Sequence, residues 1–214
     1  MRSTAKASEL LRQAAGDLWN QYVRSAFVER LRDGSLPRQV FRYYLIQDAK
    51  YVEEMQRSVI LAASKAPLDE AVKVLLALLA NPERGAEVHE RLYKSLGITN
   101  EEVKSAGMNF VNYAYTRHLR YYASLGWREF LAAWAPCMWG YSEVGRYAAS
   151  TPDPIYREWA EFYSSDDYNS RVASLLEVLD SYDVTDDMRR AFINSVRFEI
   201  GFWASALNLE PTIY

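Results

Sequence analysis

The chain has 214 residues, half of them hydrophobic, and 25 Lys and Arg against 28 Asp and Glu give a formal net charge of −3. This composition is typical of a globular protein, and the absence of a basic run argues against nucleic acid as a partner. The longest apolar run, VLLALLA, is too short to cross a bilayer, so no membrane association is expected. The single cysteine and the charge-interrupted N-terminus predict a cytoplasmic protein without an intrachain disulfide.

The N-terminal third of the chain reads as two long helices. The first is expected over residues 8–32 and ends at the turn sequence DGSLP. Ser35 is expected to cap the second helix, and Pro37 lies in its first turn, where a missing N–H does no harm. This helix is expected to continue to about residue 65, just before Pro67.

The rest of the chain continues the helical pattern. A third helix is expected over residues 68–96, with Gly97 as its stop, and the TNEE sequence that begins at Thr99 is a capping box for a short fourth helix. Further helices are expected over residues 109–126, 127–150, 151–163, 165–182 and 186–208. No repeat or long linker divides them, so the sequence predicts an all-α helical bundle with residues 1–214 as a single domain.

Two carboxylates fall on otherwise apolar helix faces. Asp48 shares a face with Tyr44, Tyr51 and Met55 by i, i+4, i+7 spacing. An ionised carboxylate on such a face has to be paired or hydrogen-bonded, or its pKa rises. Asp48 therefore either fixes packing through a tyrosine or arginine partner, or lines a polar pocket.

Glu199 repeats this pattern near the C-terminus. It lies on one face with Phe192, Val196 and Trp203, and Phe202 is beside them. Two such carboxylates on separate helices favour a polar pocket between facing helices of a bundle.

The only cysteine, Cys137, lies in AAWAPCMWGYSEVG, directly after Pro136 and one turn before Tyr141. Read alone, this stretch allows two interpretations. Cys137 is either a small buried apolar side chain or a nucleophile activated by a polar neighbour in an aromatic environment.

The two histidines, His89 and His118, lie on different predicted helices and belong to no HExxH or Cys/His cluster. The chain also has no P-loop and no GxGxxG sequence. The sequence therefore predicts no metal site and no glycine-rich phosphate-binding loop.

Five segments, in order along nearly the whole chain, resemble the TenA/thiaminase II family. They are LWNQYVRSAFVERLRDGSLPRQVFRYYLIQDAKYV, YAYTRHL, APCMWGYSEVG, YREWAEFYSSDDY, and the E-x-x-F-W pattern that begins at Glu199. The resemblance implies a heme-oxygenase-like bundle, a homotetramer, and no cofactor. It also implies hydrolysis of 4-amino-2-methylpyrimidine compounds, either aminopyrimidine or thiamin, to the hydroxymethylpyrimidine used in thiamin salvage.

The resemblance also implies roles for single residues. Cys137 matches the nucleophile, Glu199 the proton donor, Tyr51 the tyrosine that activates the cysteine, and Asp48 the carboxylate that grips the pyrimidine edge. The predicted substrate contacts are completed by Tyr141, Tyr163, Tyr115, Tyr44 and Phe202.

The chain departs from the family pattern at Ala49 and Lys50, where the family often has an aromatic, and at Gly140, where it commonly has a bulkier residue. We expect the first departure to change a subunit contact and the second to loosen the pocket wall. Two other functions stay open: a pyrimidine-binding or regulatory protein without turnover, and a cofactor-dependent oxidoreductase on the same fold.

Overall fold

A computed structural model describes residues 5–80 and 82–213. The regular structure of these residues consists of twelve α-helices and one isolated bridge between Asn109 and Thr212, which confirms the predicted all-α class. In chain order the helices are α1 (Ala7–Ala15), α2 (Asp17–Val23), α3 (Ala26–Asp33), α4 (Arg38–Ala63), α5 (Leu68–Leu79), α6 (Pro82–Leu96), α7 (Asn100–Ser105), α8 (Phe110–Leu125), α9 (Trp127–Ala148), α10 (Pro154–Ser164), α11 (Asp166–Leu179) and α12 (Asp186–Leu207).

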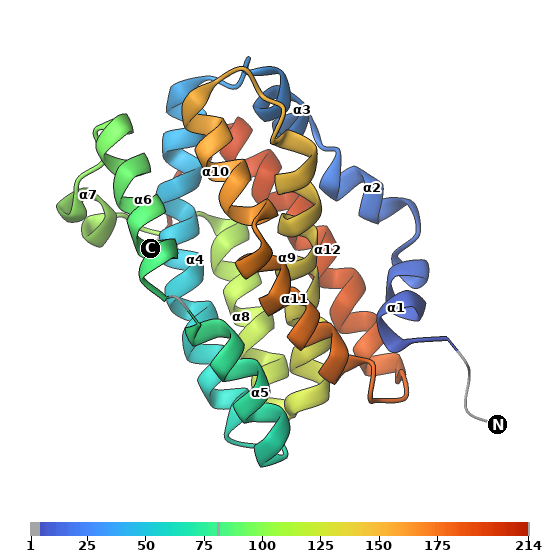
Figure 1. The fold of residues 1–214 in the computed structure, drawn as a ribbon. Coiled ribbons are helices and arrows are strands. Elements are labelled where there is room, and N and C mark those ends of the chain that lie inside the picture. The colour runs from blue at the N-terminus through green and yellow to red at the C-terminus, as the bar shows by residue number, and fades with distance from the viewer. Residues whose placement is uncertain (1–4, 81, 214) are drawn as a thin grey trace.

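Helix α9 lies at the centre of the bundle, surrounded by α4, α8, α10, α11 and α12 (Figure 1). All residues from 130 to 138 are buried, so this part of α9 has no solvent-facing side. A helix that is apolar all round belongs in the core of a bundle. Cys137 lies within this stretch, and the helices around it therefore bring their inner faces to the cysteine.

The predicted first helix is in fact three short helices. Gly16 separates α1 from α2 with a φ of +53°, a value that glycine adopts far more readily than other residues. Ser25 then has extended backbone, and its hydroxyl accepts a hydrogen bond from Val28 N–H as the N-cap of α3. The three pieces bend around α12 and α9, which one straight helix of this length could not do.

Two further boundaries differ from the prediction. The predicted third helix is divided into α5 and α6, because Ala80 has extended backbone and Pro82 opens the next helix. Ser35 does not cap α4: the N-cap is Pro37, without a side-chain hydrogen bond. Two predicted boundaries are confirmed. Gly97 ends α6 with a φ of +65°, and Thr99 caps the N-terminus of α7.

Candidate active site

Five helices bring the predicted site residues together in the interior. Helix α4 supplies Asp48 and Tyr51, α9 supplies Cys137, and α12 supplies Glu199. Asp48 is 4% exposed, Cys137 8% and Glu199 1%. The predicted aromatic contacts come from these helices and from α8 and α10, and all are buried: Tyr44, Tyr115, Tyr141, Tyr163 and Phe202. Residues up to 158 positions apart in sequence thus lie together in the core.

Asp48 is a buried carboxyl whose side chain makes no hydrogen bond to any described residue. Among the described residues, the basic group within 4 Å is His89, with Nε2 at 3.9 Å from Oδ2. Burial raises the pKa of Asp48 to about 7. A buried polar group without a partner is costly in a folded protein, so it points to a ligand.

Glu199 is a second buried carboxyl, and it has one protein partner. The Tyr115 hydroxyl donates to Oε1 at 2.8 Å. Burial raises the pKa of Glu199 to about 8; Asp48 adds to this rise, and the hydrogen bond from Tyr115 opposes it. Near neutral pH Glu199 can therefore hold a proton and release it, as a general acid and base must.

The pKa of the Cys137 thiol depends on the groups around it. Burial raises its pKa well above the ordinary value, and the negative charge of Glu199 raises it further. The Tyr51 hydroxyl makes no hydrogen bond of good geometry to the sulfur. It nevertheless interacts with the thiol and partly opposes the rise of the Cys137 pKa. A thiol in this environment rests protonated, so it needs a base as it attacks.

Aromatic rings form the walls around the three groups. The ring of Tyr141 lies 4.9 Å from that of Tyr163, and the Tyr44 hydroxyl is 3.4 Å from the Tyr141 hydroxyl. The rings of Tyr51 and Tyr115 are 5.0 Å apart. Flat apolar faces with a few hydroxyls suit an aromatic heterocycle that carries polar edge groups.

Several aromatic residues of the site were missed by sequence reasoning. Trp159 packs 4.6 Å from Tyr163, and Tyr168 packs 4.9 Å from the same ring. Both lie in the segment YREWAEFYSSDDY, so the motif itself was a signal for them. Tyr22 was also missed, and it occupies the space beside Gly140.

The expectation that Gly140 loosens the pocket wall is wrong. A Cβ atom at this position would lie 2.1 Å from Cε1 of Tyr22, which is fully buried. The Tyr22 hydroxyl donates to the carbonyl of Pro136 at 3.3 Å, directly before Cys137. The missing side chain is therefore replaced by the Tyr22 ring, and the wall stays filled.

Replacing Gly140 by leucine is expected to lower the free energy of unfolding by about 1–3 kcal/mol, because overpacking forces Tyr22 or α9 to move. Chemical denaturation measures this loss. In the double variant Tyr22→Ala, Gly140→Leu, the loss is expected to be smaller than the sum of the two single losses. Additive losses would contradict the contact between the two positions.

The departure at Ala49 and Lys50 lies away from this site. The Lys50 ammonium donates to the carbonyl of Lys104 at 2.9 Å and so joins α4 to α7. Ala49 is half-buried. Neither residue changes the walls described above.

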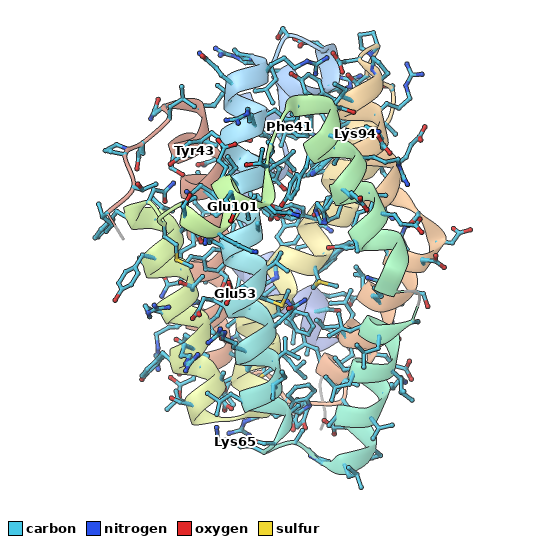
Figure 2. All side chains as sticks on the ribbon, turned by 90° about the vertical axis from the view of Figure 1, so that its left-hand side faces the viewer. Phe41, Tyr43, Glu53, Lys65, Lys94 and Glu101 are labelled. Carbon is cyan, nitrogen blue, oxygen red and sulfur yellow. The ribbon has the colours of Figure 1, made fainter. Side chains whose placement is uncertain are left out.

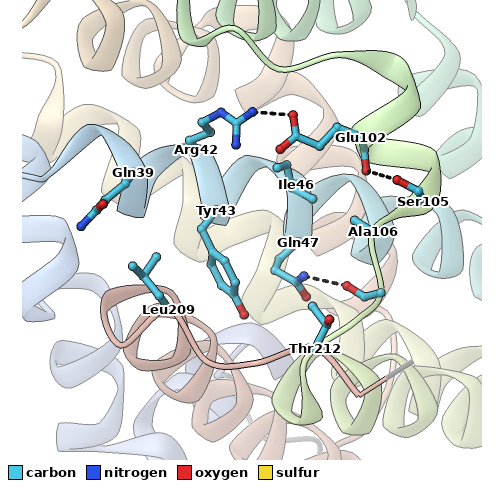
Figure 3. Close-up of a pocket in the computed structure, with 11 residues that line it drawn as sticks. Gln39, Arg42, Tyr43, Ile46, Gln47, Glu102, Ser105, Ala106, Leu209 and Thr212 are labelled. Carbon is cyan, nitrogen blue, oxygen red and sulfur yellow. Dashed lines mark hydrogen bonds and ion pairs between the residues drawn. The ribbon is translucent and has the colours of Figure 1, made fainter.

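A groove of about 520 Å³ lies on a different face of α4 (Figure 3). Arg42 on its rim is held by Glu102 of α7, and the Gln47 amide donates to the Gly107 carbonyl at 2.9 Å. Tyr43 faces the groove, whereas Tyr44 faces the candidate site. The groove is thus separate from the site around Cys137.

Histidines and acidic residues gather in no group of three or more that could hold a metal among the described residues. His118 has a packing role: its Nε2 lies 2.9 Å from Ser195 Oγ, which donates to the Ala133 carbonyl. No helix in the described part of the chain is both long and apolar enough to cross a membrane.

The two buried carboxyls make stability depend on pH. Below about pH 3, Asp48 and Glu199 are neutral in the folded and the unfolded chain, so the folded state loses nothing by burying them. Above their ordinary pKa values of 3.8 and 4.5, Asp48 and Glu199 ionise in the unfolded chain but stay protonated in the folded chain. In the folded chain they ionise only at about pH 7 and 8. The free energy of unfolding is expected to fall across this window by about 1.4 kcal/mol per pH unit for each group.

Glu199→Gln removes one of these groups, so its stability relative to wild type is expected to rise from about pH 5 to 8. Urea denaturation at intervals of pH measures the difference. Parallel stability curves for the two proteins would show that Glu199 ionises normally in the folded state.

The family model of the TENA/THI-4/PQQC family matches residues 12–209. Aminopyrimidine aminohydrolase of Bacillus subtilis (strain 168) is 31% identical over 216 residues, covering 96% of this chain and 91% of that protein. Aminopyrimidine aminohydrolase of Halalkalibacterium halodurans is 28% identical over 210 residues, covering 92% and 94%.

A solved structure of a TenA-like protein from Sulfolobus solfataricus P2 superposes with a TM-score of 0.92 at 48% identity, covering 97% of this chain and 99% of that one. The agreement therefore extends over nearly the whole arrangement of helices around α9. The resemblance to TenA proteins is confirmed, and the chain belongs to the TENA/THI-4/PQQC family.

Proposed function

We propose that this protein is an aminopyrimidine aminohydrolase, which releases hydroxymethylpyrimidine from 4-amino-2-methylpyrimidine compounds for thiamin salvage. The observation that carries the proposal is the buried carboxyl of Asp48, which makes no hydrogen bond to a described residue, in one aromatic enclosure with Glu199 and Cys137. Relatives that match over nearly the whole chain bear this enzyme name. A cluster of buried flat rings and proton-holding carboxyls supports the same substrate class.

Substrate activation is assigned to Asp48. A pyrimidine ring is a poor electrophile until an acid protonates or hydrogen-bonds a ring nitrogen. Asp48, with a pKa of about 7, holds such a proton at neutral pH. Its second oxygen can accept a hydrogen bond from the exocyclic amino group. The tyrosine rings around it stack the heterocycle and keep water scarce.

Bond cleavage is assigned to Cys137 and Glu199. The thiol passes its proton to the ionised form of Glu199, and the sulfur adds to the ring as Asp48 protonates the ring nitrogen. Glu199 then gives its proton to the leaving amine, the bond to the methylene breaks, and an exocyclic methylene remains. Tyr51 stabilises the sulfur while it carries charge.

The second half returns the enzyme to its starting state. Water adds to the exocyclic methylene and loses a proton to Glu199. The sulfur leaves the ring with its electron pair and takes that proton, and the ring nitrogen returns its proton to Asp48. The sum is the substrate amine and water converted to the alcohol and ammonia.

The test is release of hydroxymethylpyrimidine from aminopyrimidine and from thiamin, followed by chromatography. We expect turnover of both, with the larger kcat/KM for aminopyrimidine, because a small amine fits the closed aromatic enclosure better than a thiazolium. Pyrimidine binding without turnover would overturn the proposal in favour of a binding or regulatory protein.

We also propose that residues 1–214 act as one domain in a homotetramer and work in the cytoplasm. Two exposed apolar stripes support assembly: Leu68, Leu76 and Leu79 on α5, and Phe110 and Tyr121 on α8. A free thiol nucleophile supports a reducing compartment.

Light scattering is expected to give the mass of four subunits for the wild type. Leu76→Glu with Leu79→Glu is expected to give a smaller assembly, because charge on an apolar contact opposes association. A wild-type monomer, or a double variant with unchanged mass, would contradict a role of the α5 stripe.

A further inference from the structure

His89 stands between Asp48 and the solvent. Helix α6, on which it lies, runs beside α4 and packs against α10 (Figure 2). The His89 side chain is 30% exposed, whereas that of Asp48 is 6% exposed. Its ring lies 6.2 Å from the rings of Tyr93 and of Phe162. The histidine thus covers the outer side of the carboxyl with a group that can take or give a proton.

The tautomer of His89 follows from the nitrogen that faces the carboxyl. The backbone of Gly85, one turn earlier in α6, partly opposes the lowering of the His89 pKa by burial. Nε2 is the nitrogen that faces Asp48 Oδ2, at 3.9 Å. We therefore assign the proton of the neutral ring to Nδ1, which leaves the Nε2 lone pair directed to the carboxyl.

The other charged groups around His89 are engaged elsewhere. Arg91 of α6 binds Glu158 of α10 at 2.5 Å and lies 3.9 Å from Glu87. The ionisable groups that interact with Asp48 are the site residues Glu199 and Cys137 and five tyrosines: Tyr44, Tyr93, Tyr141, Tyr163 and Tyr168. Among the described residues, His89 is therefore the base available to Asp48.

We propose that His89 is a positioning residue that shares one proton with Asp48 and so keeps this carboxyl able to donate to a ring nitrogen of the substrate. The proton lies either on the carboxyl, beside the neutral ring, or on Nε2, beside the carboxylate. Contact between the two groups stabilises the state with one proton against the states with two and with none.

The ionisation of the two groups agrees with this arrangement. Burial raises the pKa of Asp48 to about 7 and lowers the pKa of His89 from 6.5. Both shifts favour the neutral pair, in which the carboxyl carries the proton. Removal of His89 is expected to let Asp48 lose its proton at a lower pH.

The coupling can be observed without any enzyme activity. The chain has two histidines, so in ¹³C-histidine-labelled protein His118 serves as an internal reference. The His89 ring signal is expected to show two inflections with pH, one of them from Asp48, and only one in Asp48→Asn. A His89 titration that is identical in both proteins would overturn the proposal.

The consequence for catalysis rests on the proposed function. In His89→Gln, kcat/KM for aminopyrimidine is expected to stay within about threefold of wild type near pH 6 and to fall by about tenfold or more near pH 8. The matched control is Glu90→Gln, an exposed position beside it on α6, whose profile is expected to follow wild type.

A loss in His89→Gln that is equal at every pH would show a packing role and overturn the proposal. If the wild type itself releases no product, the proposed function fails, and the histidine titration still decides whether the two groups share a proton. The two failures are therefore distinguishable.

Discussion

Cys137→Ser is expected to lower kcat for hydroxymethylpyrimidine release by at least about 10³-fold, because a serine hydroxyl is a far weaker nucleophile than a thiol with a base beside it. The side chain is 8% exposed, and serine is close to cysteine in size and shape. Binding of hydroxymethylpyrimidine is therefore expected to stay within a few-fold of wild type, as titration calorimetry can measure.

Cys137→Ala tests whether the loss in Cys137→Ser comes from the missing nucleophile, because alanine removes the sulfur without adding a hydroxyl. It is expected to lose turnover to the same degree, since neither variant can form the bond to the ring. Retention of wild-type kcat by either variant would make Cys137 a packing residue and leave Asp48 and Glu199 without a nucleophile between them.

Glu199→Gln is expected to lower kcat by about 10²–10⁴-fold, the usual contribution of a positioned acid or base. Gln keeps the shape and can still accept from Tyr115, whose hydroxyl binds Glu199 at 2.8 Å. It cannot take the thiol proton or give one to the leaving amine. Steady-state kinetics near pH 7 measures the effect, and KM is expected to change little.

The matched control is Glu143→Gln. Glu143 is a carboxylate of α9 that binds Arg12 and accepts from the Trp19 indole N–H at 3.0 Å, on the outer side of the helix. This variant is expected to turn over at nearly the wild-type rate. Equal losses in both variants would indicate that Glu199 acts through packing.

Local spacing was sufficient to find the two carboxyls. Asp48 and Glu199 stand on apolar helix faces at i, i+4 spacing, and this pattern alone indicates burial of a group that prefers water. Their burial in one site agrees with that reading. Their roles, and that of Cys137, came from the family resemblance, because periodicity says nothing about chemistry.

Contacts between distant segments could not be predicted in this way. Gly140 looked like a gap because its partner, Tyr22, is 118 positions earlier in the chain. His89 was weighed only as a metal ligand, since nothing in its own helix shows that Asp48 lies 3.9 Å away. The helix breaks at Gly16 and Ala80 depend on the backbone angles of these residues, which the spacing of apolar residues does not predict.

The most direct test of the account is alkylation of Cys137 by iodoacetamide, followed by intact-mass measurement and by the product assay on the same samples. Since the chain has one cysteine, each added label reports this residue alone. We predict that activity falls in proportion to the labelled fraction, and that hydroxymethylpyrimidine slows both to the same extent. Fully labelled protein that still releases hydroxymethylpyrimidine at the wild-type rate would contradict the account.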